Sequence, residues 1–250
     1  MNDGIKPCVI IPLYNHGTTI KPLIETLQKH LSCPVIIVDD GSDSITKQYL
    51  NIISNEYTDI IIMAHNKNRG KGAAFSTGIK IAKSMNLTHA LQIDADGQHD
   101  ASAAVVFFEL AGENPAALIC GFPDYDESVP KSRKNGRVVA NTWAKIVTLS
   151  SAIKDSMCGF RVYPVEETCY VIDHSYIDNR MAFDIDILVH LYWNNCPVIF
   201  HSVMVTYPKD GISHFHIIRD NSRITAVFTR LFFGMIARLP MLIMRHIKNV

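Results

Sequence analysis

The stretch LQIDADGQHD, residues 91–100, joins an apolar run to a dense group of acidic side chains. The apolar run begins at residue 89 (HALQI), and Asp94, Asp96 and Asp100 follow it closely, together with Gln98 and His99. Neighbouring carboxylates repel one another, and in an unpaired couple the pKa of one group rises. A buried strand that ends in this way is therefore favourable only where positive charge compensates the carboxylates.

Short apolar runs of this kind alternate with longer amphipathic runs along the first half of the chain. The alternation predicts an α/β fold, a three-layer α/β/α sandwich whose sheet is mostly parallel and joined by right-handed crossovers. The runs with strand character are residues 8–14, 34–40, 59–66, 89–96 and 116–122. The runs with helical spacing are residues 19–31, 45–54, 72–85 and 101–112.

The carboxyl ends of the predicted strands carry the polar groups. They read PLYNH (12–16), VDDGS (38–42), HNKNRGKG (65–72) and DADGQHD (94–100). In a doubly covered parallel sheet, ligands bind in the crevice beyond these ends. The sequence therefore predicts one crevice to which all four segments contribute.

The second half of the chain is less regular. Residues 122–137 are polar and predict a loop over the site, residues 138–153 a helix, and residues 154–164 a loop and strand. A helix at residues 181–193 and a strand at residues 197–208 follow. We expect a catalytic domain at 1–215 and a basic amphipathic helical tail at 216–250.

Charge and apolar content constrain the partners. The net charge of +0 argues against a nucleic-acid-binding protein. From residue 211 onward, however, five arginines and one lysine stand against one aspartate, a net charge of +5. An apolar segment with regularly placed arginines is typical of a helix in a membrane interface, its arginines reaching the head groups. The alternative is a helix packed on the domain or on a second copy in a homo-oligomer.

The expected location is cytoplasmic, peripheral on the cytoplasmic face of a membrane. The first residues lack the pattern of a signal peptide, and no uninterrupted apolar run of about 18 residues predicts a conventional membrane span. The six cysteines are scattered singly, which favours buried reduced thiols.

The Asp-x-Asp pattern of Asp94 and Asp96 suggests a divalent cation. Two carboxylates with substrate phosphates form the usual site for Mg²⁺ or Mn²⁺, and Gln98 adds an oxygen or orients a bound water. The alternative is a solvated acidic turn. At the second strand end, Asp39 and Asp40 have the chemistry to accept hydrogen bonds from a base, while Ser42 or Asp43 caps the next helix.

Five motifs together resemble family 2 glycosyltransferases of the GT-A fold, in particular the dolichyl- or polyprenyl-phosphate mannose synthase-like branch. They are VIIPLYN, VIIVDDGS, NRGKGAAFSTGI, LQIDADGQHD and DSMCGFRVYP, and the resemblance covers roughly residues 7–215. The chain departs from the family pattern at His16, where glutamate is common, and at residues 120–123, where an acceptor-phosphate arginine is usual.

The resemblance implies a role for each matching residue. It implies nucleotide contacts from Pro12, Tyr14, Asn15, Asp39, Asp40, Arg69, Lys71, Asp94 and Ala95. It implies metal ligation by Asp94, Asp96 and Gln98, with His214 or His216 of a late loop as a further candidate, His214 being preferred. Arg133 and Arg137 are candidates for binding the acceptor phosphate.

The implied reaction is metal-dependent transfer of a sugar from a GDP- or UDP-linked donor to a membrane lipid such as polyprenyl phosphate. The predicted catalytic residues are Asp96, Asp155, Arg161, Asp184 and Asp186. A phosphate acceptor needs no base, whereas a glycolipid or other lipid hydroxyl needs a carboxylate base: Asp155, Asp184 or Asp186. A non-catalytic nucleotide-sugar-binding protein is the remaining alternative.

Overall fold

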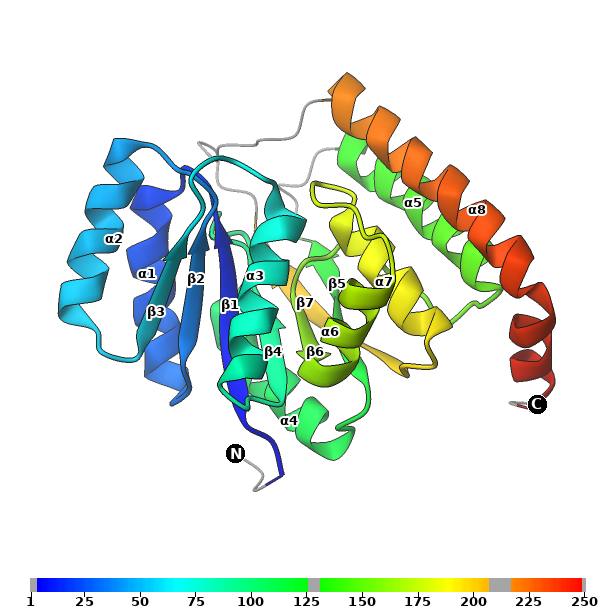
Figure 1. The fold of residues 1–250 in the computed structure, drawn as a ribbon, viewed down its shortest axis with the longest axis horizontal. Helices are drawn as coiled ribbons and strands as arrows, with labels where there is room; N and C mark the ends of the chain where they lie inside the picture. Colours follow the sequence, from blue (N-terminus) through cyan, green and yellow to red (C-terminus); the bar gives the residue numbers. More distant parts are fainter. Residues whose placement is uncertain (1–3, 126–130, 207–216, 249–250) are drawn as a thin grey trace.

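The chain folds around one seven-stranded sheet in the computed structural model, which describes residues 4–125, 131–206 and 217–248. The strand order is β3-β2-β1-β4-β6-β5-β7 (Figure 1). The strands are β1 Pro7–Leu13, β2 Val35–Asp39, β3 Ile60–Ala64, β4 His89–Gln92, β5 Leu118–Tyr125, β6 Arg161–Pro164 and β7 Val198–Val205. The helices are α1 Gly17–His30, α2 Ser44–Glu56, α3 Lys71–Ser84, α4 Ala104–Glu113, α5 Lys131–Thr148, α6 Val165–His174, α7 Phe183–Trp193 and α8 Ile217–Lys248.

The sheet is mostly parallel, as predicted. Strand β1 pairs in parallel with β2 on one side and with β4 on the other. Only β6 runs antiparallel to its neighbours β4 and β5 among the paired strands of the described residues. The parallel strands therefore deliver the ends of β1, β2 and β4 to the same edge of the sheet.

Helices cover both faces, which confirms the three-layer sandwich. One core joins apolar residues of α1, α2 and α4 to one face of the sheet. The other core joins α3, α5, α6, α7 and α8 to the opposite face. Because both faces are buried, strands such as β1 are apolar at nearly every position.

Two parts of the second half differ from the sequence-based expectation. Residues 122–137 do not form one loop: β5 extends to Tyr125 because it pairs with β7 along its whole length, and α5 already begins at Lys131. Arg133 and Arg137 therefore lie on a helix. Helix α6 was not predicted either; it follows β6 directly, without an intervening turn.

Helix α8 packs against the domain along one side. Val227, Phe228, Leu231, Met235 and Leu242 are buried in the core shared with α5 and α7. The outer side stays apolar, with Phe233, Ile236, Ile243 and Met244 exposed. By length and composition alone, Arg219–Arg245 is long and apolar enough to cross a bilayer. The sequence reading did not expect such a span.

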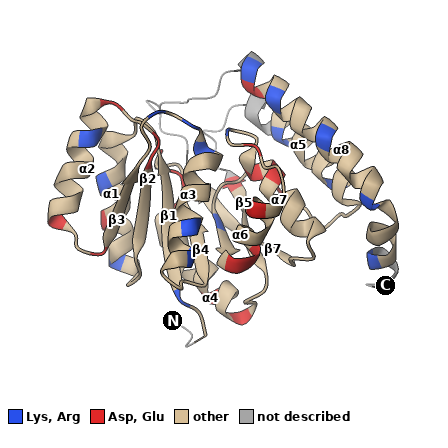
Figure 2. Cartoon of the chain, in the orientation of Figure 1, with Lys and Arg blue, Asp and Glu red and all other residues tan. Residues whose placement is uncertain are grey.

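The arginines of α8 correct the expectation that they all point to head groups. Basic positions recur along the helix (Figure 2). Arg230, Arg238 and Arg245 stack over Tyr176, Trp193 and Tyr192, with 4.5–4.7 Å between guanidinium carbon and ring centroid. A planar guanidinium stacks well on an aromatic face, so these three arginines attach the helix to the domain.

Candidate functional site

A cavity of about 1490 Å³ opens at the carboxyl ends of β1 and β4 and continues to α5 and α8. The predicted site residues that line it are Pro12, Tyr14, Asp40, Lys71, Asp94, Ala95, Asp96, Gln98, Arg137 and Asp184. Those that do not line it are Asn15, Asp39, Arg69, Asp155, Arg161 and Asp186. His214, His216 and the side chain of Arg133 lie outside the described part of the chain.

The Asp-x-Asp turn follows β4, and contacts to its backbone fix its shape. The Thr19 hydroxyl of α1 donates to the Ala95 carbonyl oxygen. The Gln98 N–H donates to the Asp96 carboxylate at 3.0 Å. Burial, and then the charge of Asp94, raise the pKa of Asp96. Added positive charge would therefore stabilise the ionised form of Asp96.

The far side of this turn is joined to the end of β7. The Thr206 N–H donates to the Gln98 carbonyl at 3.0 Å, and the Asp100 N–H donates to the Met204 carbonyl at 3.3 Å. Asp100 also accepts from the Ser102 N–H at 2.9 Å, so it caps the next helical turn. The carboxylate turn thus has fixed backbone on both sides before any ligand binds.

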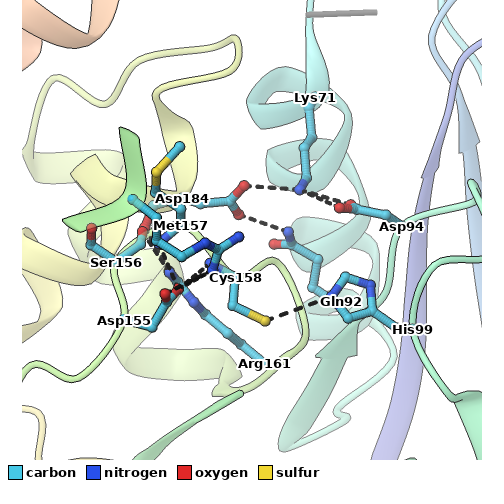
Figure 3. Close-up of polar contacts among 11 residues, drawn as sticks. Lys71, Gln92, Asp94, His99, Asp155, Ser156, Met157, Cys158, Arg161 and Asp184 are labelled. Carbon is cyan, nitrogen blue, oxygen red and sulfur yellow. Dashed lines mark hydrogen bonds and ion pairs between the residues drawn. The ribbon is translucent and has the colours of Figure 1, made fainter. Parts of the chain in front are cut away.

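Lys71 joins the first carboxylate of this turn to α7 (Figure 3). Its Nζ lies 2.7 Å from Asp94 and 2.8 Å from Asp184, and Gln92 donates to the other Asp184 oxygen at 2.8 Å. Burial alone would lower the pKa of Lys71, but Asp184 and Asp94 raise it above the ordinary value. Burial alone would raise the pKa of Asp184, but Lys71 and Arg161 hold it below the ordinary value. Lys71 and Asp184 therefore form an ion pair.

Gly159 of the retained Gly-Phe-Arg motif lies directly on this network. A Cβ at this position would come within 2.6 Å of Lys71 Nζ and 3.0 Å of Asp94 Oδ2. Any side chain here would displace the ammonium or the carboxylate. Gly159 therefore allows the backbone of this motif to lie directly against Lys71 and Asp94. The sequence did not reveal this role.

Asp155 and Arg137 form a pair at the other wall of the cavity. Arg137 Nη1 lies 2.7 Å from the Asp155 carboxylate, which also accepts from the Met157 and Cys158 N–H groups at 3.0 and 2.7 Å. Asn141 adds a contact at 3.3 Å. Asp155 is buried beneath these donors, so it fixes the loop and orients Arg137.

Arg161 and Asp186, predicted as catalytic, are both completely buried away from the cavity. Arg161 donates to the Asp184 carbonyl at 2.6 Å and to the Ser156 carbonyl at 2.9 Å. Asp186 accepts from the Asp178 N–H at 2.7 Å and from Arg230. Neither side chain lines the cavity, and each joins neighbouring segments of the chain.

The predicted nucleoside side is organised by the ends of β1 and β2. Asp40 accepts from the Arg69 and Gly70 N–H groups at 2.9 and 2.6 Å and lies 2.7 Å from His65 Nδ1. Asp40 therefore holds the segment NRGKG, residues 68–72, which is called the glycine loop below. Arg69 contributes its backbone and exposes its side chain. Asp39 accepts from the Ser42 N–H at 2.9 Å.

Asn15 links the two strand ends. Its φ of 56° lies in the left-handed region, and its side chain accepts from the Asp43 N–H at 2.9 Å. The Asn15 N–H in turn donates to the Ser42 hydroxyl oxygen at 3.0 Å. Asp43 caps α2 through the Thr46 N–H at 2.8 Å, which confirms the predicted cap.

The cavity also contains residues that sequence reasoning missed. Arg180 lines it and donates to the Asn68 side chain at 2.9 Å. An apolar wall is formed by Trp143, Phe228, Phe232 and Phe233 of α5 and α8. Neither group follows a strand, so the rule that places ligands at strand ends did not identify them.

The residues present fit a divalent cation by their donor chemistry. Asp94, Asp96 and Gln98 offer hard oxygen atoms at one end of the cavity. Among the described residues no group of three His, Cys, Asp or Glu side chains converges. Such a pair of carboxylates suits Mg²⁺ or Mn²⁺, which commonly complete their coordination with water and substrate phosphate.

Several relatives of the chain carry dolichyl-phosphate activities in their names, and two of them serve as examples. The UDP-N-acetylglucosamine–dolichyl-phosphate N-acetylglucosaminyltransferase of Methanococcus voltae is 36% identical over 103 residues, 36% of this chain and 41% of that protein. A dolichyl-phosphate beta-glucosyltransferase of Trichomonas vaginalis is 24% identical over 201 residues, 72% of this chain and 58% of that protein. These matches thus span only about half of each relative.

Solved structures share the fold at low sequence identity. Glucosyl-3-phosphoglycerate synthase of Mycobacterium tuberculosis superposes with a TM-score of 0.68 at 12% identity, covering 91% of this chain and 81% of that one. The same enzyme in complex with Mn²⁺, UDP and phosphoglyceric acid gives 0.65 at 12% identity, covering 93% and 78%. A model described as glycosyl transferase family 2 matches residues 8–166. This match extends over more than half of the sequence and includes the carboxylate turn, so the chain belongs to glycosyl transferase family 2 and is a glycosyltransferase.

Proposed function

We propose that this glycosyltransferase moves a sugar from a UDP- or GDP-linked donor to a lipid phosphate of the polyprenyl type, with the help of a divalent cation. The observation that carries the proposal is the shape of the cavity. One end holds the carboxylates Asp94 and Asp96, and the same cavity reaches the aromatic wall of α5 and α8. A charged donor and an apolar acceptor chain would thus meet in one space.

The donor end combines carboxylates with cations. Lys71, Arg137 and Arg180 line the cavity and are suited to bind phosphate oxygens. A bound Mg²⁺ or Mn²⁺ would supply Lewis-acid stabilisation of the departing diphosphate. Asp94 and Asp96 would hold that cation, and Pro12 and Tyr14 would face the nucleoside. Known neighbours of the same fold bind UDP, which makes UDP-sugars the first donors to test.

The state of the predicted bases favours a phosphate acceptor over a hydroxyl. Asp155 is buried under Arg137 and backbone donors, Asp184 is paired with Lys71 and Gln92, and Asp186 lies outside the cavity. None of the three is arranged to take a proton from an acceptor in the cavity. A lipid phosphate is already ionised and needs no such step.

The exposed side of α8 supports a membrane location. Its exposed apolar residues run from Phe233, which also lines the cavity, to Met244, while its buried residues pack in the core shared with α5 and α7. We therefore propose that α8 lies in the membrane interface with its outer side toward the lipid. We propose the cytoplasmic face because the six cysteines are free, as expected in a reducing compartment.

The decisive test is an assay of nucleotide release and lipid product with purified protein, Mn²⁺ and a panel of UDP- and GDP-sugars. The acceptors are polyprenyl phosphate and the matched polyprenol in the same vesicles. We expect product with the phosphate and none with the alcohol. An Asp96→Ala variant should lose transfer, whereas Asp100→Asn, an exposed residue of the same loop outside the cavity, should keep it.

Each alternative has its own outcome in this assay. Product with the polyprenol or a glycolipid alone would favour a hydroxyl acceptor and a carboxylate base. Donor binding by calorimetry without turnover of any donor and acceptor pair would favour a non-catalytic nucleotide-sugar-binding protein. Undiminished transfer by Asp96→Ala would contradict the role proposed for the carboxylate turn.

A further inference from the structure

Arg230 of α8 differs from the other stacked arginines of this helix in its partner. Its guanidinium lies 4.6 Å above the Tyr176 ring and forms an ion pair with Asp186. Asp186 is completely buried, and neither residue lines the cavity. The pair therefore connects the interfacial helix to the interior of the catalytic domain without touching a ligand.

The carboxylate oxygen that meets Arg230 has a second partner. Asp186 Oδ2 also accepts from the Asp178 N–H at 2.7 Å. Asp178 begins the short segment 178–181, which precedes α7, and its own side chain accepts from the Arg180 N–H at 2.7 Å. Asp186 Oδ2 therefore holds the start of segment 178–181 and also accepts a hydrogen bond from the cationic Arg230 of α8.

Segment 178–181 lies on the glycine loop that carries Lys71. The Ala73 N–H donates to the Asn179 carbonyl at 3.2 Å, and Arg180 donates to the Asn68 side chain at 2.9 Å. A Cβ at Gly70, where φ is 106°, would lie 2.2 Å from the Asn179 carbonyl oxygen. The two segments are therefore in close backbone contact, and a shift of one displaces the other.

We propose that Arg230 is a positioning residue of the donor site, acting through Asp186 and segment 178–181 on Arg180 and Lys71. The proposal rests on the proposed function, in which these two cations bind the donor diphosphate. Removing Arg230 leaves the buried Asp186 carboxylate without this cation and changes the acceptor of the Asp178 N–H. Arg180 and the glycine loop then lose their fixed position at the cavity.

Arg238 provides a matched control on the same helix. It stacks on Trp193 at 4.7 Å and donates to the Gly234 carbonyl at 3.1 Å. Trp193 is the last residue of α7, at the opposite end from Asp186 and segment 178–181. Loss of Arg238 weakens the attachment of α8 without acting on the Asp186 carboxylate.

The test measures UDP binding by calorimetry with Mn²⁺, and the KM for donor, for Arg230→Gln, Arg230→Lys and Arg238→Gln. We expect Arg230→Gln to weaken UDP binding by roughly threefold to thirtyfold, with the donor KM rising more than kcat falls. Arg230→Lys should restore most of the affinity, and Arg238→Gln should bind UDP as the wild type does. Hydrogen exchange should accelerate in peptides with residues 68–75 and 176–183 for Arg230→Gln alone.

Two results would overturn the proposal: wild-type UDP affinity in a folded Arg230→Gln, or an equal loss in Arg238→Gln. If Arg230→Gln does not fold, the comparison moves to Asp186→Asn, which removes the buried charge. Adding Arg230→Gln to that background should leave UDP affinity unchanged, and a further tenfold loss would contradict the relay. Failure of the wild type to bind either UDP or GDP would instead contradict the proposed donor, while the exchange data would still test the relay.

Discussion

Replacing Asp184 by Asn tests whether the ion network under the cavity is part of the fold's stability. The Lys71 and Asp184 side chains are 16% and 8% exposed, and their charged atoms are 2.8 Å apart. Asn keeps the shape of the side chain and an oxygen but removes the charge. Lys71 then retains Asp94 as its carboxylate partner, at 2.7 Å.

The expected cost follows from the burial of the pair. Removing one partner of a buried ion pair costs about 3–5 kcal/mol of the free energy of unfolding. Because Lys71 keeps Asp94 and some contact with water, we expect a smaller loss than this, about 2–3 kcal/mol. For a domain of this size, such a loss lowers Tm by roughly 4–12 °C.

The pH dependence has a definite sign. The folded pKa of Asp184 is held below its ordinary value by Lys71 and Arg161, although burial alone would raise it. Its stabilisation is therefore fully present above the unfolded pKa of about 3.9 and is lost as pH falls through the lower folded pKa. The difference between wild type and Asp184→Asn should be constant from about pH 5 to 8 and shrink below about pH 4.

Urea titrations followed by circular dichroism between pH 3 and 7, in the presence of a chelator, measure this difference. Asp173→Asn is the matched control, because Asp173 pairs with Lys80 at 2.7 Å but is 49% exposed. Exposed pairs contribute little, so its stability should stay near that of the wild type. Equal stability of Asp184→Asn and wild type at pH 7, or a gap that widens in acid, would refute the reasoning.

Three further predictions concern the cavity itself. Asp96→Ala should lower transfer by at least about a hundredfold while circular dichroism shows an intact fold. Gly159→Ala should lower kcat about a hundredfold and also lower Tm, because the new Cβ would displace the polar ends of Lys71, Asp94 and Gln92. Phe232→Ser, at the apolar wall, should raise KM for a long-chain polyprenyl phosphate more than for a short one, with donor affinity unchanged.

The strand ends were predictable because apolar runs and the parallel crossovers between them leave little freedom. The separate roles of neighbouring residues within each strand end could not be predicted. Asp39 and Asp40 are indistinguishable by pattern, yet Asp40 is the one that lines the cavity and holds the glycine loop. Arg180 contacts Asn68, and Asp186 contacts Arg230. These partners are far apart in sequence, so no local residue spacing predicts the contacts.

The charge balance of the Asp-x-Asp turn depends on Lys71, a residue of another element. From sequence, the repulsion between Asp94 and Asp96 required an added cation. In the folded chain Lys71 already compensates Asp94, whereas burial and the neighbouring charge leave Asp96 with a raised pKa. Donor diphosphate brings further negative charge to the same place, and Lys71 is shared with Asp184. The charge still to be balanced is therefore that of Asp96 and the diphosphate together, which is where a divalent cation would stabilise the complex most.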